Sequence, residues 1–378
     1  MQEINESLKL VLSRQFGIEP DKIHNETHLV DDLGADSLDL MEIVMIIESK
    51  FKVRIEESEY NNALVVNDII NLINQKQQKV SPHSLKYHIH ENGWTVILDD
   101  FDFAKANQDD VNELAWLLAT NTLVVAKNQN HLTIDDQLRV VHMFGDVEDL
   151  SHFGDVPPYT NFTLPGSQGK IARVTGELDE HGEPGLFGHV SDLDWHCNQP
   201  GMSSRKPLVW LFGIKGTAGS RTSWTNNILA YHDLSDEWKE KIKDLKLICG
   251  WKKDSYSEYD FGKAKSGITE DFNEHYTPSL VHTNNGGKTG LFFPFLQFRN
   301  FVGMSEKESL DIVEPLRDHI LQDKYIYHHD WQDGDIVISE QWLGIHKRWE
   351  FAGMPNRILH RITFDYKNSN IVAKLTTK

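Results

Sequence analysis

The hydrophobic pattern of the chain changes near residue 80, and this change limits the possible folds more than any other feature. Before it, apolar residues recur at helical spacing, as in Ile4, Leu8, Val11 and Leu12, which predicts an amphipathic helix. After it, short runs rich in β-branched and aromatic residues predict strands. The 378 residues are enough for two domains. We therefore expect a small all-α domain followed by a larger, mostly β domain.

The same pattern gives approximate bounds for individual elements. A second apolar stripe predicts a helix over Leu38–Phe51, and a short last helix is expected at Asn67–Ile73 with Asn67 as its N-cap. The polar run from Gln75 to Pro82 has the composition of a linker. Strands separated by helical insertions indicate an all-β core decorated with helices. The expected strands are Trp94–Leu98, Thr122–Ala126, Leu208–Phe212, Gly290–Phe293, Asp335–Ser339 and Ile358–Tyr366, and the expected helices between them are Gln108–Leu118 and Ser305–Leu321.

Composition excludes several classes of function. A net charge of −19 argues against nucleic acid or an anionic membrane as a partner, because both need a cationic face. No apolar run reaches the length of a membrane span, and the N-terminus lacks the pattern of a secretory signal. Cys197 and Cys249 are the only cysteines, too few for a disulfide framework. We expect a cytoplasmic protein.

An Asp-Ser pair at positions 36 and 37 precedes the second predicted helix. A lone pair of this kind usually caps a helix and does nothing more. Here, however, carboxylates crowd the same end of the helix. That density raises mutual repulsion and suggests a surface kept acidic to meet basic partners. The acidic residues are Asp31, Asp32, Asp36, Asp39 and Glu42.

The segment LVDDLGADSLDLMEIVM, residues 29–45, resembles the signature of acyl carrier proteins, and the resemblance covers essentially all of residues 1–78. It implies a four-helix carrier domain, followed by a linker at residues 79–86. It also implies a 4'-phosphopantetheine arm on Ser37 that holds an acyl group as a thioester. The implied partners are a phosphopantetheinyl transferase and an acyl- or aminoacyl-loading enzyme.

A second set of residues lies far apart in the chain. His196 follows Trp195, and a lone histidine in such a position is usually structural. Alternation along the last strand puts Arg357, Leu359 and Arg361 on one side and His360 on the other. Two arginines directed into a β-core are unfavourable unless an anion meets them, and a dicarboxylic acid would suit their guanidinium groups. The alternative is a pair of surface arginines on an edge strand.

These positions resemble the taurine dioxygenase (TauD/TfdA) family of iron(II)/2-oxoglutarate oxygenases over roughly residues 87–370. The resemblance implies a double-stranded β-helix, or jelly roll, with helical insertions, and we expect this domain at residues 87–378. The two metal histidines of the family fall on His196 and His346. The resemblance makes His196, His346 and Arg357 the expected catalytic residues.

The same resemblance assigns the cosubstrate. The arginine that binds 2-oxoglutarate falls on Arg357, eleven residues after His346, and a second arginine falls on Arg361. The threonine that contacts 2-oxoglutarate falls on Thr222. In this family oxygen splits 2-oxoglutarate into succinate and carbon dioxide while a C–H bond of the substrate is oxidised. The expected cofactors are therefore Fe(II), 2-oxoglutarate and O2.

One position departs from the family. Its metal motif is His-x-Asp or His-x-Glu, whereas Asn198 stands at the carboxylate position here. Asn198 could ligate iron through its amide oxygen, or it could leave room for an exogenous anion, as a small residue does in related halogenases. Metal binding could also be impaired, or another carboxylate could substitute; the candidates are Asp192, Asp194 and Glu340. Cys197, between His196 and Asn198, is expected to point away and pack in the core.

Taken together, the two resemblances imply an oxygenase that works on an acyl or aminoacyl group tethered to its own carrier, in secondary metabolite or lipid biosynthesis. Hydroxylation is the default outcome. The alternatives are halogenation, desaturation, or a catalytically silent docking module. The carrier could be served in cis or by a neighbouring chain of a homo-oligomer. The aromatic run Phe292–Phe298 could line the substrate entrance or be an ordinary core strand and turn.

Overall fold

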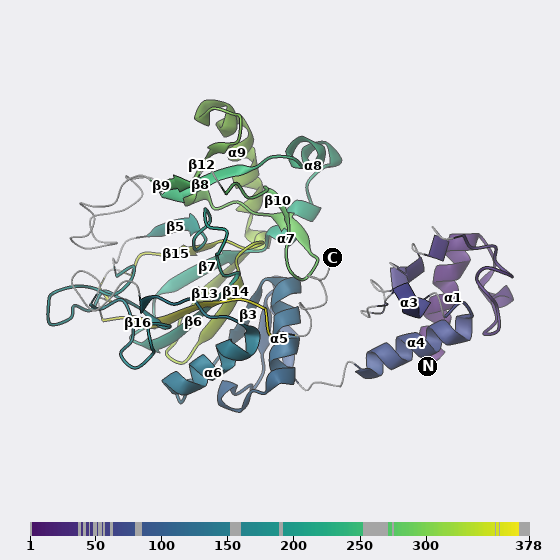
Figure 1. Cartoon of the computed structure of the whole chain (residues 1–378), viewed down its shortest axis with the longest axis horizontal. Helices are drawn as coiled ribbons and strands as arrows, with labels where there is room; N and C mark the ends of the chain where they lie inside the picture. The colour runs from purple at the N-terminus through teal and green to yellow at the C-terminus, as the bar shows by residue number, and fades with distance from the viewer. Residues whose placement is uncertain are drawn as a thin grey trace. The chain divides into compact units, whose positions relative to one another are not determined.

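A computed structural model of the chain describes most of its residues. The chain divides into two compact units, residues 1–84 and 85–378, each treated by itself below (Figure 1). The division falls inside the segment expected as a linker. None of the described helices is both long and apolar enough to cross a membrane. The described residues are 2–36, 39–40, 43–44, 46–47, 51, 55, 57–60, 63–79, 85–151, 160–188, 192–251, 271–273, 276–351, 353–354 and 356–369.

The first unit is helical. Its described elements are α1 (Gln2–Phe16), the 3-10 turn η1 (Pro20–Lys22), α3 (Glu57–Tyr60) and α4 (Val66–Lys79). Helical backbone is also described at residues 39–40, 43–44, 46–47 and 51, within the second predicted helix. The apolar stripes meet in one core, as their periodicity predicts. Its buried members include Leu8, Leu12, Ile43, Ile47, Val66, Ile69, Ile70 and Ile73.

Two expectations for the end of this unit were wrong. Helix α4 begins at Val66, so Asn67 lies inside the helix and is not its cap. The polar residues Gln75 to Gln78, together with Lys79, continue the same helix and do not belong to a linker. Polarity alone cannot separate a linker from the polar end of a helix, because both lack apolar residues. Residues 80–84 lie outside the described part of the chain.

The second unit is built on two β-sheets. The larger has seven strands in the order β1-β2-β3-β14-β6-β16-β4, and all its pairings are antiparallel except β2 with β3. The smaller has four strands in the order β13-β7-β15-β5. The first sheet contains β1 (Tyr87–Ile89), β2 (Val96–Leu98), β3 (Leu123–Ala126), β14 (Ile336–Glu340), β6 (Leu208–Lys215), β16 (Ile358–Phe364) and β4 (Ala172–Thr175). The second contains β13 (Ile326–Asp330), β7 (Arg221–Thr225), β15 (His346–Arg348) and β5 (Leu193–His196).

Alternation along the strands separates two cores. On β6, Val209 and Leu211 contribute to a cluster shared with Trp224 and Tyr327 of the four-stranded sheet, so these inner faces meet. Trp210, between them in sequence, points the other way into the largest core. Strand β6 is thus buried on both faces, by the second sheet on one side and by the largest core on the other, and this explains its nearly continuous apolar sequence.

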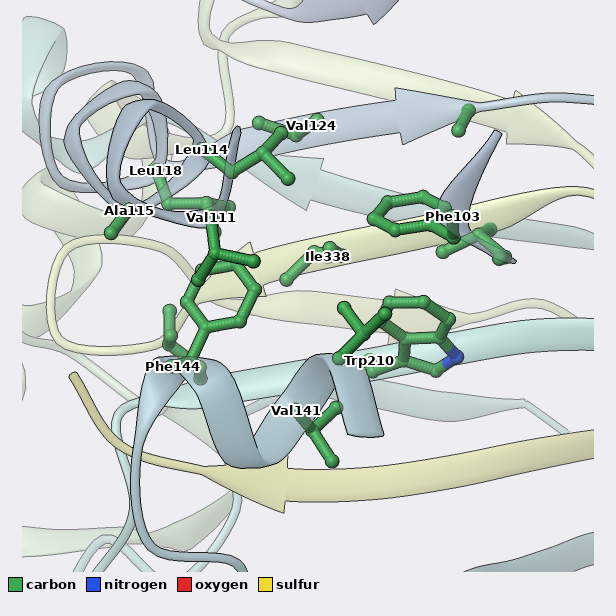
Figure 2. Packing of buried hydrophobic residues seen from close by; sticks show 14 of the residues in the cluster. Phe103, Val111, Leu114, Ala115, Leu118, Val124, Val141, Phe144, Trp210 and Ile338 are labelled. Atoms are coloured by element: carbon green, nitrogen blue, oxygen red, sulfur yellow. The ribbon is translucent and has the colours of Figure 1, made fainter. Parts of the chain in front are cut away.

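Two helices cover the outer face of the seven-stranded sheet. Helices α5 (Gln108–Asn121) and α6 (Ile134–Phe144) each begin with a capping box, formed by Asn107 with Asp110 and by Thr133 with Asp136. Figure 2 shows their apolar side chains gathered against this sheet. The labelled members are Phe103, Val111, Leu114, Ala115, Leu118, Val124, Val141, Phe144, Trp210 and Ile338.

The remaining elements form a third layer of structure beside the sandwich (Figure 1). A three-stranded sheet in the order β12-β8-β9 and the pair β10-β11 share a core with helix α9 (Glu306–Ile320). These strands are β8 (Leu247–Trp251), β9 (Asp271–Asn273), β10 (Val281–Thr283), β11 (Thr289–Leu291) and β12 (Phe298–Phe301), and the short helices nearby are α7 (Asn227–His232) and α8 (Asp236–Ile242).

Candidate active site

Two histidines that are 150 positions apart in sequence meet on the inner face of the four-stranded sheet. Strand β15 pairs with β5 so that His346 lies opposite His196. Their ring centroids are 4.1 Å apart, and both side chains are buried. Residues opposite each other on neighbouring strands share a face, which is why the pairing brings the two imidazoles together.

The pairing of β15 with β5 is irregular beside the histidines. Arg348 lies opposite Leu193, so two residues of β5 (Asp194 and Trp195) face the single residue Lys347 of β15. This extra residue is a β-bulge, a device that redirects side chains. His196 Nδ1 lies 2.6 Å from the carbonyl oxygen of Asp194. The imidazole therefore donates through Nδ1 and leaves Nε2 available as an acceptor or metal ligand.

Both imidazoles are neutral at ordinary pH. Burial lowers the pKa of His196 to about 4. Burial also lowers the pKa of His346 well below its usual value, and the neighbouring His196 ring and Arg361 guanidinium oppose its protonation further. A neutral imidazole is the form that binds a transition metal.

Asn198 follows the end of β5 and is buried. Its backbone N–H and its side-chain Nδ2 both donate to Gln341 Oε1, at 2.9 Å each. Within the part of the chain that the structure describes, no donor hydrogen-bonds Asn198 Oδ1. The amide oxygen is thus the free end of this side chain.

The other carboxylates considered for this position are engaged elsewhere. Asp192 and Asp194 pair with Lys347 at 3.2 and 3.6 Å. Glu340 is buried and accepts hydrogen bonds from the backbone N–H groups of Trp342 and Leu343, both at 3.0 Å. Among the described residues, no group of three or more His, Cys, Asp or Glu side chains could hold a metal ion. Asn198, whose amide oxygen is not used within the described structure, remains the candidate for a third protein ligand.

Arg357 lies immediately before β16 and is only 2% exposed. Its Nε donates to Ser220 Oγ at 2.9 Å, and its guanidinium carbon lies 4.7 Å from the ring centre of Phe351. Its Nη1 is buried without a partner in the described structure. Burial lowers the pKa of Arg357 to about 9, with a further contribution from Arg348, so the side chain remains cationic at neutral pH. A buried guanidinium with a spare donor is poised for an anion.

Arg361 lies on the same face of β16, four residues further on. Its Nη2 is 3.9 Å from Glu148 Oε2, too long for a hydrogen bond, and its buried Nε has no partner in the described structure. Glu148 in turn accepts a short hydrogen bond from Thr363 Oγ1. Both arginines are interior because β16 lies between β6 and β4. The alternative of two surface arginines on an edge strand is therefore wrong.

Comparison with known families agrees with this arrangement. A family model described as taurine catabolism dioxygenase TauD, TfdA family, matches residues 86–363. The chain belongs to the TauD/TfdA family. Members of this family are iron- and 2-oxoglutarate-dependent dioxygenases, so the larger unit of this chain is a dioxygenase domain.

Solved structures show the same fold for the TauD/TfdA domain. A putative alpha-ketoglutarate-dependent taurine dioxygenase from Burkholderia xenovorans is 18% identical, with a TM-score of 0.57 over 74% of this chain and 89% of that one. The structure of AAD-2 in complex with Mn(II) and N-oxalylglycine is also 18% identical, with a TM-score of 0.60 over 74% of this chain and 97% of that one.

The first unit matches a second model, that of the phosphopantetheine attachment site, over residues 6–73. An acyl carrier protein from Thermotoga maritima is 37% identical over 75 residues, which are 20% of this chain and 93% of that protein. Another from Campylobacter fetus is 40% identical over 68 residues, 18% of this chain and 88% of that protein. The chain therefore joins an acyl carrier domain to a TauD/TfdA domain, and a carrier domain implies modification by a phosphopantetheinyl transferase.

On the carrier domain, Ser37 lies outside the described residues, but its neighbours are described. Asp36 Oδ1 accepts from the N–H of Asp39 at 3.0 Å, and Asp39 Oδ2 accepts from the N–H of Asp36 at 3.1 Å. This reciprocal pair is the capping arrangement that the Asp-Ser sequence predicts.

Within the TauD/TfdA domain, the residues around the histidines suit the family's metal and cosubstrate. Two neutral imidazoles and one amide oxygen could hold Fe(II), and the spare donors of Arg357 and Arg361 could hold a dianion. Thr222 lies on β7, opposite Arg348, and its Oγ1 accepts from Trp331 Nε1 at 2.9 Å. That bond leaves the hydroxyl proton of Thr222 free to donate.

Several neighbours of this site carry no signal in the sequence. Gln341, Ser220 and Glu148 contact the predicted residues, yet each is an ordinary polar residue far away in the chain. Only the expectation that a buried guanidinium needs partners could have indicated them, and it does not say which residues supply them.

Cys197 and the aromatic run after position 291 lie in the interior. Cys197 packs with Trp195, Phe292 and Ile345, on the side of β5 away from the histidines, as alternation predicts. Phe292 and Phe293 are fully buried, which agrees with the core interpretation of this run. Cys197 is thus a packing residue and not part of the histidine pair.

Proposed function

We propose that the TauD/TfdA domain oxidises an acyl or aminoacyl group held by phosphopantetheine on Ser37 of the carrier domain in the same protein. The observation that carries this proposal is the union of the two domains in one chain. Joining a carrier to an enzyme raises the effective concentration of the tethered group by orders of magnitude without any new contact. Hydroxylation is the proposed outcome.

In this proposal, His196, His346 and Asn198 hold Fe(II). When bound with 2-oxoglutarate, the metal supplies the oxidising chemistry, and the protein supplies geometry and exclusion of water. Burial keeps both histidines neutral, so they bind without first losing a proton. The 2.6 Å contact to the Asp194 carbonyl orients His196.

Arg357, Arg361 and Thr222 hold 2-oxoglutarate. Arg357 is fixed by Ser220 and Phe351 before any ligand arrives, so little side-chain freedom is lost on binding. Its spare Nη1 makes a charge-assisted bond to a carboxylate of the cosubstrate. The Thr222 hydroxyl donates to the same ligand.

The test uses the full chain with its phosphopantetheine arm, loaded in turn with a panel of acyl and aminoacyl groups. With Fe(II), 2-oxoglutarate and oxygen, we expect succinate and the gain of one oxygen atom on the arm, measured by intact-protein mass spectrometry. A matched Ser37→Ala chain cannot carry the arm and should give no modified product. Absence of both succinate and a mass change across a broad panel would count heavily against the proposal.

A second candidate is a catalytically silent module that docks the carrier for other enzymes, and Asn198 in place of a carboxylate favours it. Anaerobic titration with Fe(II) and 2-oxoglutarate separates the two, since a charge-transfer absorption band would defeat the silent interpretation. Halogenation predicts a product that depends on chloride, and equal product without halide would exclude it. Desaturation predicts the loss of two hydrogen atoms from the arm.

A further inference from the structure

The contact between Asn198 and Gln341 fixes which way both amides face. A backbone N–H can only donate, so the Gln341 atom that meets the N–H of Asn198 is its oxygen. That same oxygen lies 2.9 Å from the side-chain amide of Asn198, so the Asn198 atom that meets it is the NH2 group. The carbonyl oxygen of Asn198 must then point away from Gln341.

Gln341 is itself held firmly. It is 1% exposed, and its backbone is bonded on both sides. The backbone N–H of Gln341 donates to the carbonyl of Pro207 at 2.8 Å, and the backbone carbonyl of Gln341 accepts from Arg205 Nη2 at 2.6 Å. Arg205 is buried, with its guanidinium carbon 4.2 Å from the ring centre of Trp342 and 4.8 Å from that of Phe292. The NH2 group of Gln341 is buried without a partner in the described structure, and reversing this amide would place that NH2 against the backbone N–H of Asn198, so the observed orientation is the one that keeps both bonds.

We infer that Gln341 is a positioning residue that presents the carbonyl oxygen of Asn198 to the metal site and disfavours a carboxylate at position 198. This inference rests on the proposed role of His196, His346 and Asn198 as the metal site. A carboxylate at 198 would bring an anionic oxygen 2.9 Å from the oxygen of Gln341, replacing a hydrogen bond with repulsion between lone pairs. Asn198 and Gln341 are thus a matched pair, and the amide is a built ligand of this site.

The inference is tested by a double-mutant cycle on Fe(II) affinity, measured anaerobically with 2-oxoglutarate through the charge-transfer band. The variants are Asn198→Asp, Gln341→Met and the double variant, where methionine keeps the volume of glutamine without its acceptor. Gln341→Met should weaken Fe(II) binding about tenfold, because the side chain of Asn198 then has no partner that fixes its orientation before the metal binds. Asn198→Asp should raise Fe(II) affinity about tenfold more in the Gln341→Met background than with Gln341 present.

Gln297 offers a matched control. It holds the same strand, accepting from the N–H of Cys197 at 3.1 Å and donating to its carbonyl at 2.6 Å, but it acts on the side away from the histidines. Gln297→Met should lower the melting temperature of the metal-free protein without altering the effect of Asn198→Asp. A Gln341 of merely structural importance would behave in the same way as Gln297.

The outcomes separate the two proposals. A wild-type chain with no Fe(II)/2-oxoglutarate band overturns the metal site itself and this inference with it. A wild-type band, together with an equal gain from Asn198→Asp in both backgrounds, overturns the role of Gln341 alone. The role of Gln341 is supported if Asn198→Asp raises Fe(II) affinity more in the Gln341→Met background than in the wild type, and if the Gln297→Met background shows no such increase.

Discussion

Strand β16 places His360 on the side covered by helices and Arg361 on the side facing the second sheet, one residue apart. His360 Nδ1 lies 3.0 Å from Gln137 Oε1 of α6, and its ring packs edge-on against Phe212. Arg361 and Arg357, on the opposite side, each keep a buried donor without a partner in the described structure. On one face of the strand His360 finds its partner within the protein, whereas on the other face two guanidinium donors have no partner among the described residues.

His360 and the two arginines differ in how their hydrogen bonds are completed, although all three are buried. Burial depresses the pKa of His360 and of Arg357 alike. For these residues, the difference is whether the hydrogen bonds are completed within the described structure. The substitutions below are given in order of the expected free-energy change, from largest to smallest. They test whether a substitution on one face of the sheet affects stability or ligand affinity on that face alone.

The largest effect is expected from Phe144→Ala on the helix side. Phe144 is fully buried and packs edge-on against Phe364 at 5.1 Å between ring centres. The cavity should lower the free energy of unfolding by about 3–5 kcal/mol, measured by denaturant titration. The affinity of the remaining folded protein for 2-oxoglutarate should stay unchanged. A large loss of that affinity would show that the two faces are coupled.

Arg357→Leu should have the next largest effect, on the ligand side. Removal of the buried cation should weaken 2-oxoglutarate binding roughly 100-fold or more, equivalent to about 3 kcal/mol, in the anaerobic titration. Arg221→Leu is the matched control, because Arg221 pairs with Asp330 on a half-exposed surface. Equal losses from both substitutions would remove Arg357 from the cosubstrate site.

His360, on the helix side of β16, predicts a pH dependence of stability. Burial lowers the pKa of His360 from 6.5 to about 4, so the unfolded chain binds a proton that the folded one does not between these values. Its contribution to stability is complete above about pH 6.5 and falls by roughly 3 kcal/mol as the pH drops to 4. The difference in unfolding free energy between wild type and His360→Gln should change by that amount over this range. A constant difference would contradict the assignment.

The smallest effect is expected from Ser220→Ala, which removes the hydroxyl that accepts from Arg357 Nε at 2.9 Å. Loss of one hydrogen bond to a charged group should weaken 2-oxoglutarate binding by about 1–2 kcal/mol, or roughly five- to thirtyfold. Thermal unfolding of the ligand-free protein serves as the control. A fall in melting temperature without a change in affinity would make Ser220 a structural residue only.

Sequence reasoning succeeded where a pattern fixes the direction of a side chain. Alternation placed Arg357, Leu359 and Arg361 on one side of a strand and His360 on the other, and the cores show Leu359 on the inner side. It could not identify Gln341 as the partner of Asn198, since 143 positions separate them and no periodicity links the two. Nor could it place Asn67 inside a helix, because a favourable cap residue is also tolerated one position further on. Local patterns specify faces; long-range partners follow from the pairing of strands.

The bulge between Leu193 and His196 has a consequence for how this protein can vary. Because side chains alternate, an odd step of three positions would normally turn these two residues to opposite faces, and the extra residue brings them to the same face. Deleting Asp194 or Trp195 would remove the extra residue. Either Leu193 would then lose its pairing with Arg348, or His196 would lose its position opposite His346. A change in the loops that leaves the pairing of β5 with β15 intact should therefore keep the histidine pair in place.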